Sequence, residues 1–354
     1  MVAGNPEQGG ATWAVLQYVL GLRRLGHDVF LVEPVHEFSP TTVAYFQKVA
    51  QRFGLTARAA LVASGRRESV GLPYRRVREV ASSADMLINI SGLLADEDLR
   101  KAPIGVYVDL DPAFNQLWHA AEEIEVGFEG HTHFVTVGCA IGRDDCDIPT
   151  CGFEWIATLQ PVVLAEWPLA NGFVHDALTT IGNWRAYGSI DHDGVFYGQK
   201  AHALRELIDL PRLTDERFLL ALAIHPDEPD LSALHENGWG LVNPADVAGT
   251  PDKYRRFIQG SKAEFGIANS GYVRSRCGWF SDRSACYLAC GRPVLAQETG
   301  FSRFLPVGEG LLAFATADDV LAAIDEIRGD YSRHAGAARA LAEESSRGSS
   351  PVRA

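Results

Sequence analysis

Two carboxylates that end an apolar strand are the first candidates for chemistry in this sequence. Residues 104–109 have the composition of a buried strand, and the chain then continues as Asp109-Leu110-Asp111-Pro112. A carboxylate whose pKa is raised by partial burial can act as a general base towards a hydroxyl group. Alternatively, Asp109 or Asp111 caps the helix predicted over 113–123. His131 and His133 are alternative bases, although such a pair is more often a structural hydrogen-bonding site.

A second candidate is the stretch 278–300, whose pattern is loop, helix, tight turn, strand and loop. Ser281 and Asp282 are residue types that cap a helix N-terminus, because their side-chain oxygens accept from its free N–H groups. A Cys-Gly pair ends that helix, and a short apolar strand follows over 293–296. The free N–H groups and positive dipole end of such a helix suit a phosphate group. The same pattern also fits an ordinary helix–strand unit with no ligand.

Near the start of the chain, Gly9 and Gly10 precede residues with the spacing of an amphipathic helix. Glycines allow a close backbone approach to a diphosphate, although they also occur in tight turns that bind no ligand. A Rossmann-type domain begins with a strand that leads into such a turn. Only Met1, Val2 and Ala3 are available here to form it. We therefore expect either a very short first strand or a sequence that starts late.

The rest of the chain supplies the elements that would position these residues. Apolar runs of strand length alternate with segments of helical periodicity, which predicts an α/β fold with parallel sheets. Strands are predicted at 29–32, 85–91, 104–109, 132–138, 178–182, 218–223, 239–242, 264–268, 293–296 and 310–314. Helices are predicted at 41–53, 113–123, 200–207, 254–258, 317–327 and 331–345. The alternation divides into one domain over 1–165, a second over 166–330, and a C-terminal helix with a polar tail over 331–354.

Length and charge limit the functions that this chain can have. Its 354 residues are 47% hydrophobic, enough for two domains with their own cores. The net charge of −13 argues against a nucleic-acid partner, because phosphate backbones are bound by clustered Lys and Arg. No apolar run approaches the roughly 20 residues of a transmembrane helix, and no signal pattern begins the chain. We expect a soluble, cytoplasmic protein.

The six cysteines match no zinc motif with two close pairs. Cys139, Cys146 and Cys151, with His131 and His133 nearby, are the one group that could bind a metal. Reduced, mostly buried thiols fit a cytosolic chain better, so we expect no metal site.

Two blocks of the sequence resemble GT-B glycosyltransferases. ACGRPVLA at 289–296 is similar to the A-C-G-x-P-V-I-A block that closes the nucleotide-sugar site in the C-terminal domain of these enzymes. Gly9-Gly10 with LRRLGHDV at 22–29 is similar to their G-G…L-x-x-x-G-H-x-V opening. The resemblance implies two Rossmann-like domains across a cleft, the first on the acceptor side and the second binding the nucleotide-sugar. It implies transfer of a sugar from a nucleotide-diphosphate-sugar to a hydroxyl acceptor, with neither a metal ion nor a separate cofactor.

The resemblance also implies roles for individual residues. Asn183 and Arg185 after the first strand of the second domain, with Lys200 at a helix start, resemble the Arg…Lys pair that neutralises the donor diphosphate. Positive charge is needed there because the leaving group is a nucleoside diphosphate. The remaining donor contacts would come from Gly9, Gly10, Ser281, Asp282, Glu298, Thr299 and Gly300. The Asp-x-Asp pattern of Asp109 and Asp111 also resembles the metal-binding pair of the other glycosyltransferase fold class. Enzymes of that class have a single-domain layout, which does not fit this chain.

The sequence departs from the family at one informative place. Retaining enzymes with the closest pattern carry two Glu residues with seven residues between them, and the matching positions counted back from Cys290-Gly291 are Gly278 and Cys286. A thiol does not accept two ribose hydroxyls as a carboxylate does. Three alternatives therefore stay open: a GT-B sugar-nucleotide epimerase, a non-catalytic GT-B protein that binds a nucleotide or partner, and an NAD-dependent enzyme. The last is weakest, because no G-x-G-x-x-G follows a first strand.

Overall fold

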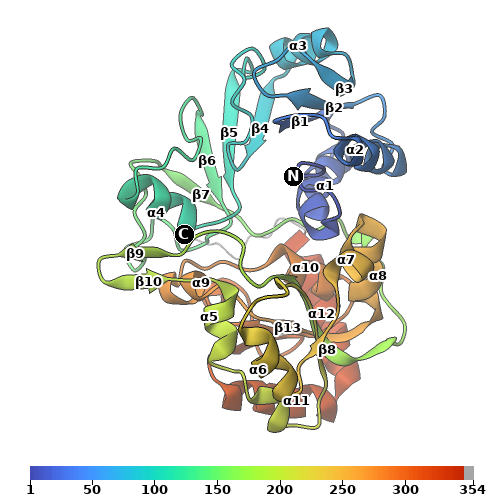
Figure 1. Ribbon diagram of the computed structural model, residues 1–354, viewed down its shortest axis with the longest axis vertical. Coiled ribbons are helices and arrows are strands. Elements are labelled where there is room, and N and C mark those ends of the chain that lie inside the picture. Colours follow the sequence, from blue (N-terminus) through green and yellow to red (C-terminus); the bar gives the residue numbers. More distant parts are fainter. Residues whose placement is uncertain (347–354) are drawn as a thin grey trace.

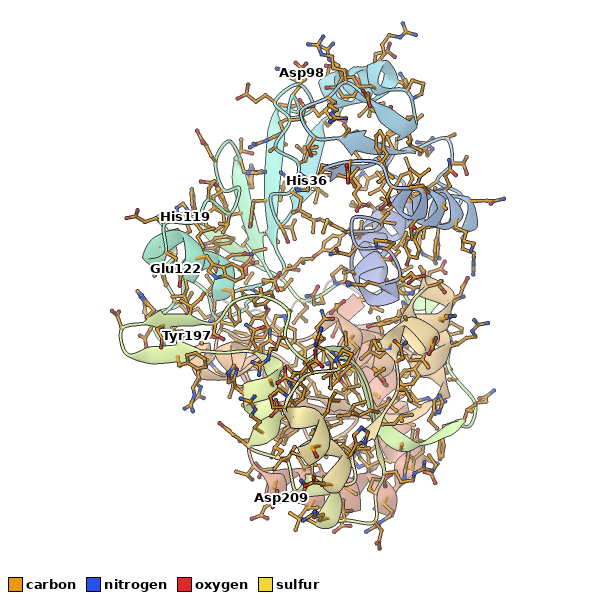
Figure 2. The ribbon with its side chains drawn as sticks, in the orientation of Figure 1. His36, Asp98, His119, Glu122, Tyr197 and Asp209 are labelled. Atoms are coloured by element: carbon orange, nitrogen blue, oxygen red, sulfur yellow. The ribbon has the colours of Figure 1, made fainter. Side chains whose placement is uncertain are left out.

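The computed structural model describes residues 1–346 and shows two α/β halves, one above the other in Figure 1. Asp98 and Asp209 mark the two far ends of the molecule in Figure 2. The expected α/β class with parallel sheets is confirmed. The polar tail expected at the end of the chain lies, beyond residue 346, outside the described residues. No helix within 1–346 has both the length and the apolar character needed to cross a membrane.

The second half is a complete doubly wound unit. Its six strands are all parallel and lie in the order β12-β11-β8-β13-β14-β15, which in chain order is 3-2-1-4-5-6. The strands are β8 (His175–Asn183), β11 (Phe218–Ala223), β12 (Gly240–Leu241), β13 (Ser261–Gly266), β14 (Val294–Gln297) and β15 (Leu311–Phe314). The helices are α5 (Lys200–Arg205), α6 (Asp230–Glu236), α7 (Pro244–Ala248), α8 (Pro251–Gly260), α9 (Ser270–Ser275), α10 (Asp282–Ala289) and α11 (Ala317–Gly329). Short 3₁₀ helices are η2 (Leu210–Arg212) and η3 (Phe301–Arg303).

The first half carries two smaller sheets. One has the order β1-β2-β3 and the other β4-β5-β6-β7. The strands are β1 (Leu31–Val35), β2 (Ala59–Ala63), β3 (Ser69–Gly71), β4 (Met86–Ile90), β5 (Ile104–Asp109), β6 (His133–Thr136) and β7 (Trp155–Ala157). The helices are α1 (Gly9–Arg24), α2 (Pro40–Arg52), α3 (Tyr74–Ser83) and α4 (Phe114–Ala121). No strand precedes α1 within the described chain, so the first element is a helix.

Three further elements join or bridge the halves. The connection between β7 and β8 includes the 3₁₀ helix η1 (Leu164–Glu166), and the final helix α12 (Tyr331–Ser346) packs on α10 and contacts η1. A hairpin of β9 (Ile190–His192) and β10 (Val195–Tyr197) extends from the second half to α4 of the first. Figure 2 shows Tyr197 of this hairpin below Glu122, the residue that follows α4.

The long helices and central strands follow the predicted pattern closely, and the short elements α5 and β12 were also predicted, whereas several others, including α6, α7 and α9, were not. The segment 104–109 and the segment 218–223 are strands with the predicted bounds. Periodicity did not predict β2, β3, α3, β7 or the β9–β10 hairpin. Most of these segments are too short to show a period of their own, so their positions depend on neighbouring elements.

The hydrophobic core is continuous between the halves. One buried cluster joins Trp13 and Phe46 of the first half to Trp167, Tyr254 and the apolar face of α10. Another joins Phe114 and Leu117 of α4 to Tyr197, Tyr272 and Ile190 of the second half. The two halves are therefore held together at both sides by apolar burial, which is the main stabilising contribution at such interfaces.

Candidate functional site

The carboxyl ends of strands from both halves meet around Asp111. This residue follows β5, and its Oδ1 accepts hydrogen bonds from the hydroxyls of Tyr187 (3.2 Å) and Tyr272 (3.0 Å) of the second half. Tyr187 follows β8, and Tyr272 lies in α9 after β13. Asn269 donates to the Tyr187 hydroxyl at 3.0 Å and completes the cluster. In an open α/β sheet this edge is the usual position of a ligand site.

Asp111 has the environment of a general base. Burial raises its pKa above the ordinary aspartate value, and the two tyrosine hydrogen bonds oppose that rise. Its side chain is partly exposed, and no hydrogen bond to its second carboxylate oxygen is found within residues 1–346. A free oxygen and a raised pKa are what proton abstraction from a hydroxyl requires.

Asp109 has a different position, although it is only two residues away. Its carboxylate is fully buried and accepts from Asn115 (2.7 Å), Gln116 (2.9 Å) and Thr136 (2.8 Å). It also accepts from the backbone N–H of Asp111 at 3.1 Å. Burial raises the pKa of Asp109 to about 6 despite these bonds. With its oxygens occupied on the protein side, Asp109 fixes the loop that presents Asp111.

The two histidines lie apart from this cluster. His131 contacts Asn89 (3.0 Å) and the carbonyl oxygen of Phe128 (3.1 Å), and burial lowers its pKa. His133 is exposed and contacts Thr132. His131 is thus held by contacts within the first half, and neither histidine reaches the Asp111 cluster.

Positive charge is buried at the carboxyl end of β8. The Nζ of Lys200 donates to the carbonyl oxygen of Ile267 at 2.5 Å, and only 6% of this residue is exposed. A Cβ on Gly182 would lie 3.3 Å from the Lys200 side chain and 3.9 Å from the guanidinium of Arg283. The glycine thus leaves room for two cations to converge. Burial, reinforced by Arg283, lowers the pKa of Lys200 to about 7.

Arg283 is the site residue that the sequence analysis missed. Its Nε donates to Glu264 at 2.6 Å and its Nη1 to the carbonyl oxygen of Ile181 at 2.7 Å. The second oxygen of Glu264 is buried and has no hydrogen-bond partner within residues 1–346. Arg283 and Glu264 therefore form a buried ion pair, and Lys200, whose pKa is about 7, adds a positive charge beneath the strand ends when it is protonated. The sequence does contain an indication of this role: Arg283 directly follows the helix-capping pair Ser281-Asp282, a position from which a side chain can turn towards the sheet.

Arg185 and Asn183 are not brought to these cations. Arg185 forms a bidentate ion pair with Glu228 at 3.0 and 3.1 Å, and its side chain is 43% exposed. Asn183, the last residue of β8, is exposed. The predicted pairing of Arg185 with Lys200 is absent from this conformation, because Glu228 after β11 holds the arginine outward.

Helix α10 begins as the sequence predicts. Ser281 is its N-cap, with Oγ accepting from the Arg283 N–H at 3.2 Å, and Gly291 follows its end with φ +71°. Asp282 is partly exposed, and burial raises its pKa. Its charge also acts on Asp111 and Tyr18 of the first half. The helix start is therefore directed at the junction of the two halves.

The loop after β14 is tied to the loop before α10. The Thr299 hydroxyl donates to the carbonyl oxygen of Trp279, and the Gly278 N–H donates to that of Thr299 at 2.8 Å. Gly300 has φ +91°, and a Cβ there would lie 2.5 Å from the Arg276 carbonyl oxygen. Glu298 accepts from the Gly300 N–H at 2.5 Å. These residues thus shape one surface near the junction, with Thr299 buried inside it.

The two positions that carry Glu in the resembled enzymes are closed. A Cβ on Gly278 would lie 2.9 Å from the Ala140 nitrogen of the first half, and its φ is +77°. Cys286 is 3% exposed and accepts from Gln17 of α1 at 3.6 Å. Neither position has room for a carboxylate in this conformation, so the absence of both Glu residues matches the packing between the halves.

Gly9 and Gly10 also lie at this junction. A Cβ on Gly9 would be 2.4 Å from the Thr250 carbonyl oxygen and 2.5 Å from that of Ala248. A Cβ on Gly10 would be 2.9 Å from the Tyr254 ring. The glycine pair therefore permits close contact between the halves. In this conformation, residues of the second half fill the space beside the two glycines.

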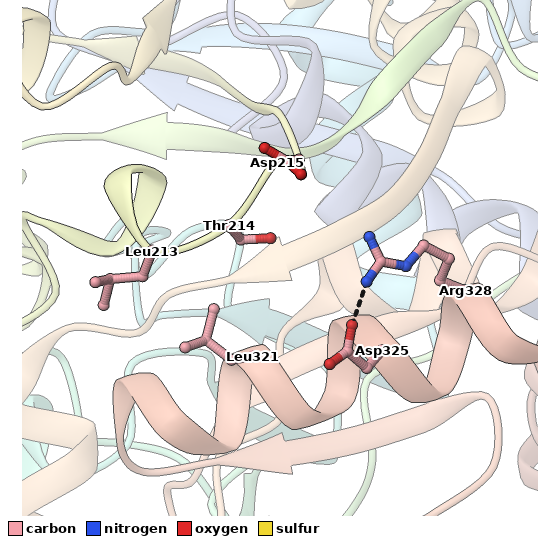
Figure 3. A pocket seen from close by; sticks show the side chains of 6 residues that line it. All are labelled: Leu213, Thr214, Asp215, Leu321, Asp325 and Arg328. Atoms are coloured by element: carbon pink, nitrogen blue, oxygen red, sulfur yellow. Dashed lines mark hydrogen bonds and ion pairs between the residues drawn. The ribbon is translucent and has the colours of Figure 1, made fainter.

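Cavities also occur away from these residues. One of about 350 Å³ lies at the carboxyl ends of β1 and β2, and its lining includes Arg66, Arg67, Asp96 and Asp98. No set of His, Cys, Asp or Glu with metal-binding geometry occurs within residues 1–346, and all six cysteines are free. A cavity of about 290 Å³ is lined by residues before β11 and on α11, including Asp325 and Arg328 (Figure 3). It lies at the amino end of β11, the opposite edge from Asp111 and Lys200.

Comparison with known proteins shows resemblance in structure and not in sequence. No protein-family model and no curated sequence matches this chain. The crystal structure of Anabaena Alr3699/HepE in complex with UDP-glucose has a TM-score of 0.58 at 10% identity, covering 99% of this chain and 94% of that one. An α-glucosyltransferase in complex with UDP-glucose and abasic DNA has a TM-score of 0.58 at 11% identity, with coverages of 95% and 92%. A glycosyltransferase from Rickettsia africae has a TM-score of 0.51 at 12% identity, with coverages of 95% and 90%.

These similarities extend over nearly the whole of each chain, so they include both halves and their arrangement. At such low identity they establish the fold alone. This chain has the GT-B fold of two Rossmann-like units, as in those glycosyltransferases.

Proposed function

We propose that this protein is a glycosyltransferase that moves a sugar from a nucleoside-diphosphate-sugar to a hydroxyl acceptor. The observation that carries the proposal is the buried pair Lys200 and Arg283, which converge beside Gly182 at the carboxyl end of β8. Two cations with one carboxylate between them leave positive charge where a diphosphate leaving group would need it. Asp111 lies across the junction with a free carboxylate oxygen.

The proposed reaction uses these groups in one displacement. Asp111 takes the proton of the acceptor hydroxyl. At the same time, the oxygen of that hydroxyl forms a bond to the anomeric carbon of the donor sugar. The bond from that carbon to the phosphate oxygen breaks, and the nucleoside diphosphate leaves with its electron pair. Lys200, Arg283 and the N-terminus of α10 stabilise the charge that develops on it. In this proposal no metal ion takes part, since the chain's own cations supply the positive charge.

Binding of the donor requires the halves to separate near Gly9, because that glycine contacts the backbone of Ala248 and Thr250. Hinge opening of two domains around a ligand is a common motion. In the opened form we expect the donor to be held by Lys200, Arg283 and Ser281. Gly10, Asp282, Glu298, Thr299 and Gly300 would line the same space. Arg185 and Asn183 would join them only after Arg185 leaves Glu228.

The test is acceptor-dependent release of nucleoside diphosphate. UDP-sugars are the first donors to try, since two of the three structural neighbours above are complexes with UDP-glucose. A glycosyltransferase releases nucleoside diphosphate and forms a glycoside only when a hydroxyl acceptor is present. Binding of nucleoside diphosphates with no turnover on any acceptor would favour a non-catalytic protein, which the closed positions at Gly278 and Cys286 also support. Acceptor-independent release of altered free sugar would instead identify an epimerase.

A further inference from the structure

The candidate general base of the first half is contacted by side chains of the second half. Asp111 follows β5, whereas the two hydroxyls that donate to its Oδ1 belong to Tyr187 and Tyr272, which lie 76 and 161 residues further along the chain. Helix α4, the β9–β10 hairpin and α9 come together at this side of the molecule (Figure 1). Contact between the halves therefore decides which groups surround the Asp111 carboxylate.

The hydrogens of the two phenols are available to this carboxylate. Each phenol has one hydrogen, and an ionised carboxylate only accepts hydrogen bonds. The phenol oxygens of Tyr187 and Tyr272 are 3.0 Å apart, but the charged oxygen of Asp111 is the stronger acceptor. The Asn269 amide donates to the Tyr187 oxygen at 3.0 Å, which leaves the Tyr187 hydrogen for Asp111. Burial raises the pKa of both tyrosines well above the ordinary value, so both remain protonated donors.

Aromatic packing fixes the two tyrosine rings. The Phe114 ring of α4 lies edge-on to both, with its centre 4.8 Å from that of Tyr187 and 5.3 Å from that of Tyr272. Trp118, one turn later on α4, contacts the Tyr187 ring at 5.1 Å. Trp279 stacks on the Tyr272 ring at 4.3 Å. Because the rings are already held by these contacts, their hydroxyls lose little further freedom when they bind a carboxylate.

The loop that carries Asp111 is held in an unusual backbone conformation. Ala113 joins this loop to α4 with φ +72° and ψ −49°, close to the strained γ-turn region that residues other than glycine avoid. Its N–H donates to the Gln116 side chain at 2.7 Å, and Gln116 in turn donates to Asp109 at 2.9 Å. A strained backbone persists only where its surroundings enforce it. These contacts hold Asp111 towards the tyrosines of the second half.

We propose that Tyr187 and Tyr272 are positioning residues for the general base. Their hydroxyls hold Oδ1 of Asp111 and favour its ionised form, which leaves the second carboxylate oxygen free for the acceptor hydroxyl. This inference rests on the proposed function, because that function assigns the role of base to Asp111. The second half would then act on the reaction twice, through the cations that stabilise the leaving group and through these two hydroxyls.

Other groups also act on Asp111, and they are the same in every variant compared below. Burial does most to raise the pKa of Asp111, and the charges of Asp282 and Asp109 add to that rise, whereas the amino group of Met1 opposes it. A Tyr→Phe change removes one donor to the ionised carboxylate and introduces no charge. The pKa of Asp111 should therefore rise when either hydroxyl is removed.

The test follows the Asp111 carboxyl group itself. Protein labelled with ¹³C at the aspartate carboxyl carbons is titrated by NMR, and Asp111→Asn identifies the resonance. In Tyr187→Phe and in Tyr272→Phe we expect the pKa of Asp111 to rise by about 0.5–1 unit, the scale of one hydrogen bond. Tyr197→Phe is the matched control. This tyrosine is 8% exposed in the same cluster, its hydroxyl has no hydrogen-bond partner within residues 1–346, and its loss should leave the pKa of Asp111 unchanged.

Steady-state kinetics give a second readout with the same variants. The acidic limb of kcat against pH should move to higher pH in both tyrosine variants, because the base must be unprotonated. At a fixed pH near 7, kcat should fall by about 10-fold while the KM for the donor stays unchanged, since neither hydroxyl is assigned to the donor. Thermal denaturation checks that the variants are folded. Tyr187→Phe is the milder of the two changes, because its side chain is partly exposed.

Three outcomes are distinguishable. Equal pKa values of Asp111 in the wild type and in all three Phe variants would overturn the proposal, even if some variants were less stable. A raised pKa with an unchanged kcat and an unchanged acidic limb would also overturn it, because the tyrosines would then not act on the base. A raised pKa in a protein that turns over no acceptor would count against the proposed function, while the effect of the two hydroxyls on Asp111 would be confirmed.

Discussion

At the scale of residues, the function proposed here depends on a few buried ionised groups whose placement costs stability. Lys200 and Arg283 share one carboxylate, Glu264, and an uncompensated buried charge is unfavourable. A bound ligand with negative charge would offset this unfavourable burial of positive charge. Lys200 and the two aspartates each lead to testable consequences for binding, stability or turnover.

Lys200→Met should weaken nucleoside diphosphate binding by about 10- to 100-fold, the scale of a lost charge-assisted hydrogen bond of roughly 1–3 kcal/mol. Stability should be unchanged or higher, because the long side chain is kept and a buried charge is removed. Calorimetry and thermal denaturation measure the two effects. Arg185→Ala is the matched control, and its binding should be close to wild type because Arg185 pairs with Glu228. Full affinity in Lys200→Met would exclude a donor role for this lysine.

The same lysine predicts a pH dependence of stability. In the folded protein its pKa is about 7, whereas the ordinary value is 10.5. Between these values the unfolded chain binds more protons than the folded one, so stability increases as pH rises from about 7 towards 10.5. Denaturant unfolding at pH 6.5 and pH 9 should show this increase in the wild type. A slope that persists unchanged in Lys200→Met would assign it to other groups.

Substitutions of the two neighbouring aspartates should have different effects, one on turnover and the other on stability. Asp111→Asn should keep donor binding and lower turnover by about 10²–10⁴-fold, as expected for a lost general base. Asp109→Asn should instead lower the free energy of unfolding by about 1–3 kcal/mol, since two of its four donors would then face an amide NH₂ group. Steady-state kinetics with chemical denaturation distinguish these outcomes. If Asp111→Asn retains full turnover with the true acceptor, the base lies elsewhere.

At the scale of elements, glycines decide how closely α1 approaches the second half. Helix α1 begins at Gly9, directly against the carbonyl groups before α8. Contact at this distance is possible only without a Cβ, because a real Cβ is not found within 3.0 Å of a backbone atom.

Gly9→Ala should therefore lower the melting temperature and enlarge the radius of gyration, as the halves move apart to relieve the clash. Gly336→Ala in α12 is the matched control, because nothing lies within 4 Å of a Cβ there. That change should be neutral or stabilise by up to about 1 kcal/mol. Thermal denaturation and small-angle scattering measure both variants. Equal behaviour of the two would mean that the contact at Gly9 is readily relaxed.

At the scale of the whole molecule, the apolar core crosses from one half to the other. Trp13 of α1 is 1% exposed, stacks obliquely on Trp167 at 4.9 Å, and donates to the Pro251 carbonyl oxygen at 2.9 Å. Continuity of this kind makes unfolding of the two halves cooperative. It also means that opening for a donor is opposed by apolar contacts on this side of the junction.

Trp13→Ala should lower the free energy of unfolding by about 3–5 kcal/mol, the usual cost of a buried tryptophan. It should also split the unfolding transition or broaden it, because the link between the halves is weakened. Leu25→Ala, at a residue that is 76% exposed, should leave the transition unchanged. Differential scanning calorimetry gives the comparison. A single sharp transition at the wild-type temperature would show that Trp13 does not couple the halves.

The sequence by itself determined the class of fold and its regular elements. Strand 104–109, strand 218–223 and helix α10 with its Ser281 cap and Gly291 end were predictable, because hydrophobic period and capping chemistry are local properties. The resemblance of two blocks led to the GT-B arrangement, which the structural neighbours confirm.

Only the tertiary structure decided which polar residues share a site. It separated Asp111 from Asp109, added Arg283 to Lys200, and paired Arg185 with Glu228. These outcomes depend on hydrogen bonds between residues up to 161 positions apart in the chain, such as Tyr272 to Asp111. Local periodicity and residue type carry no information on such contacts, because burial and partners are set by how the two halves pack together.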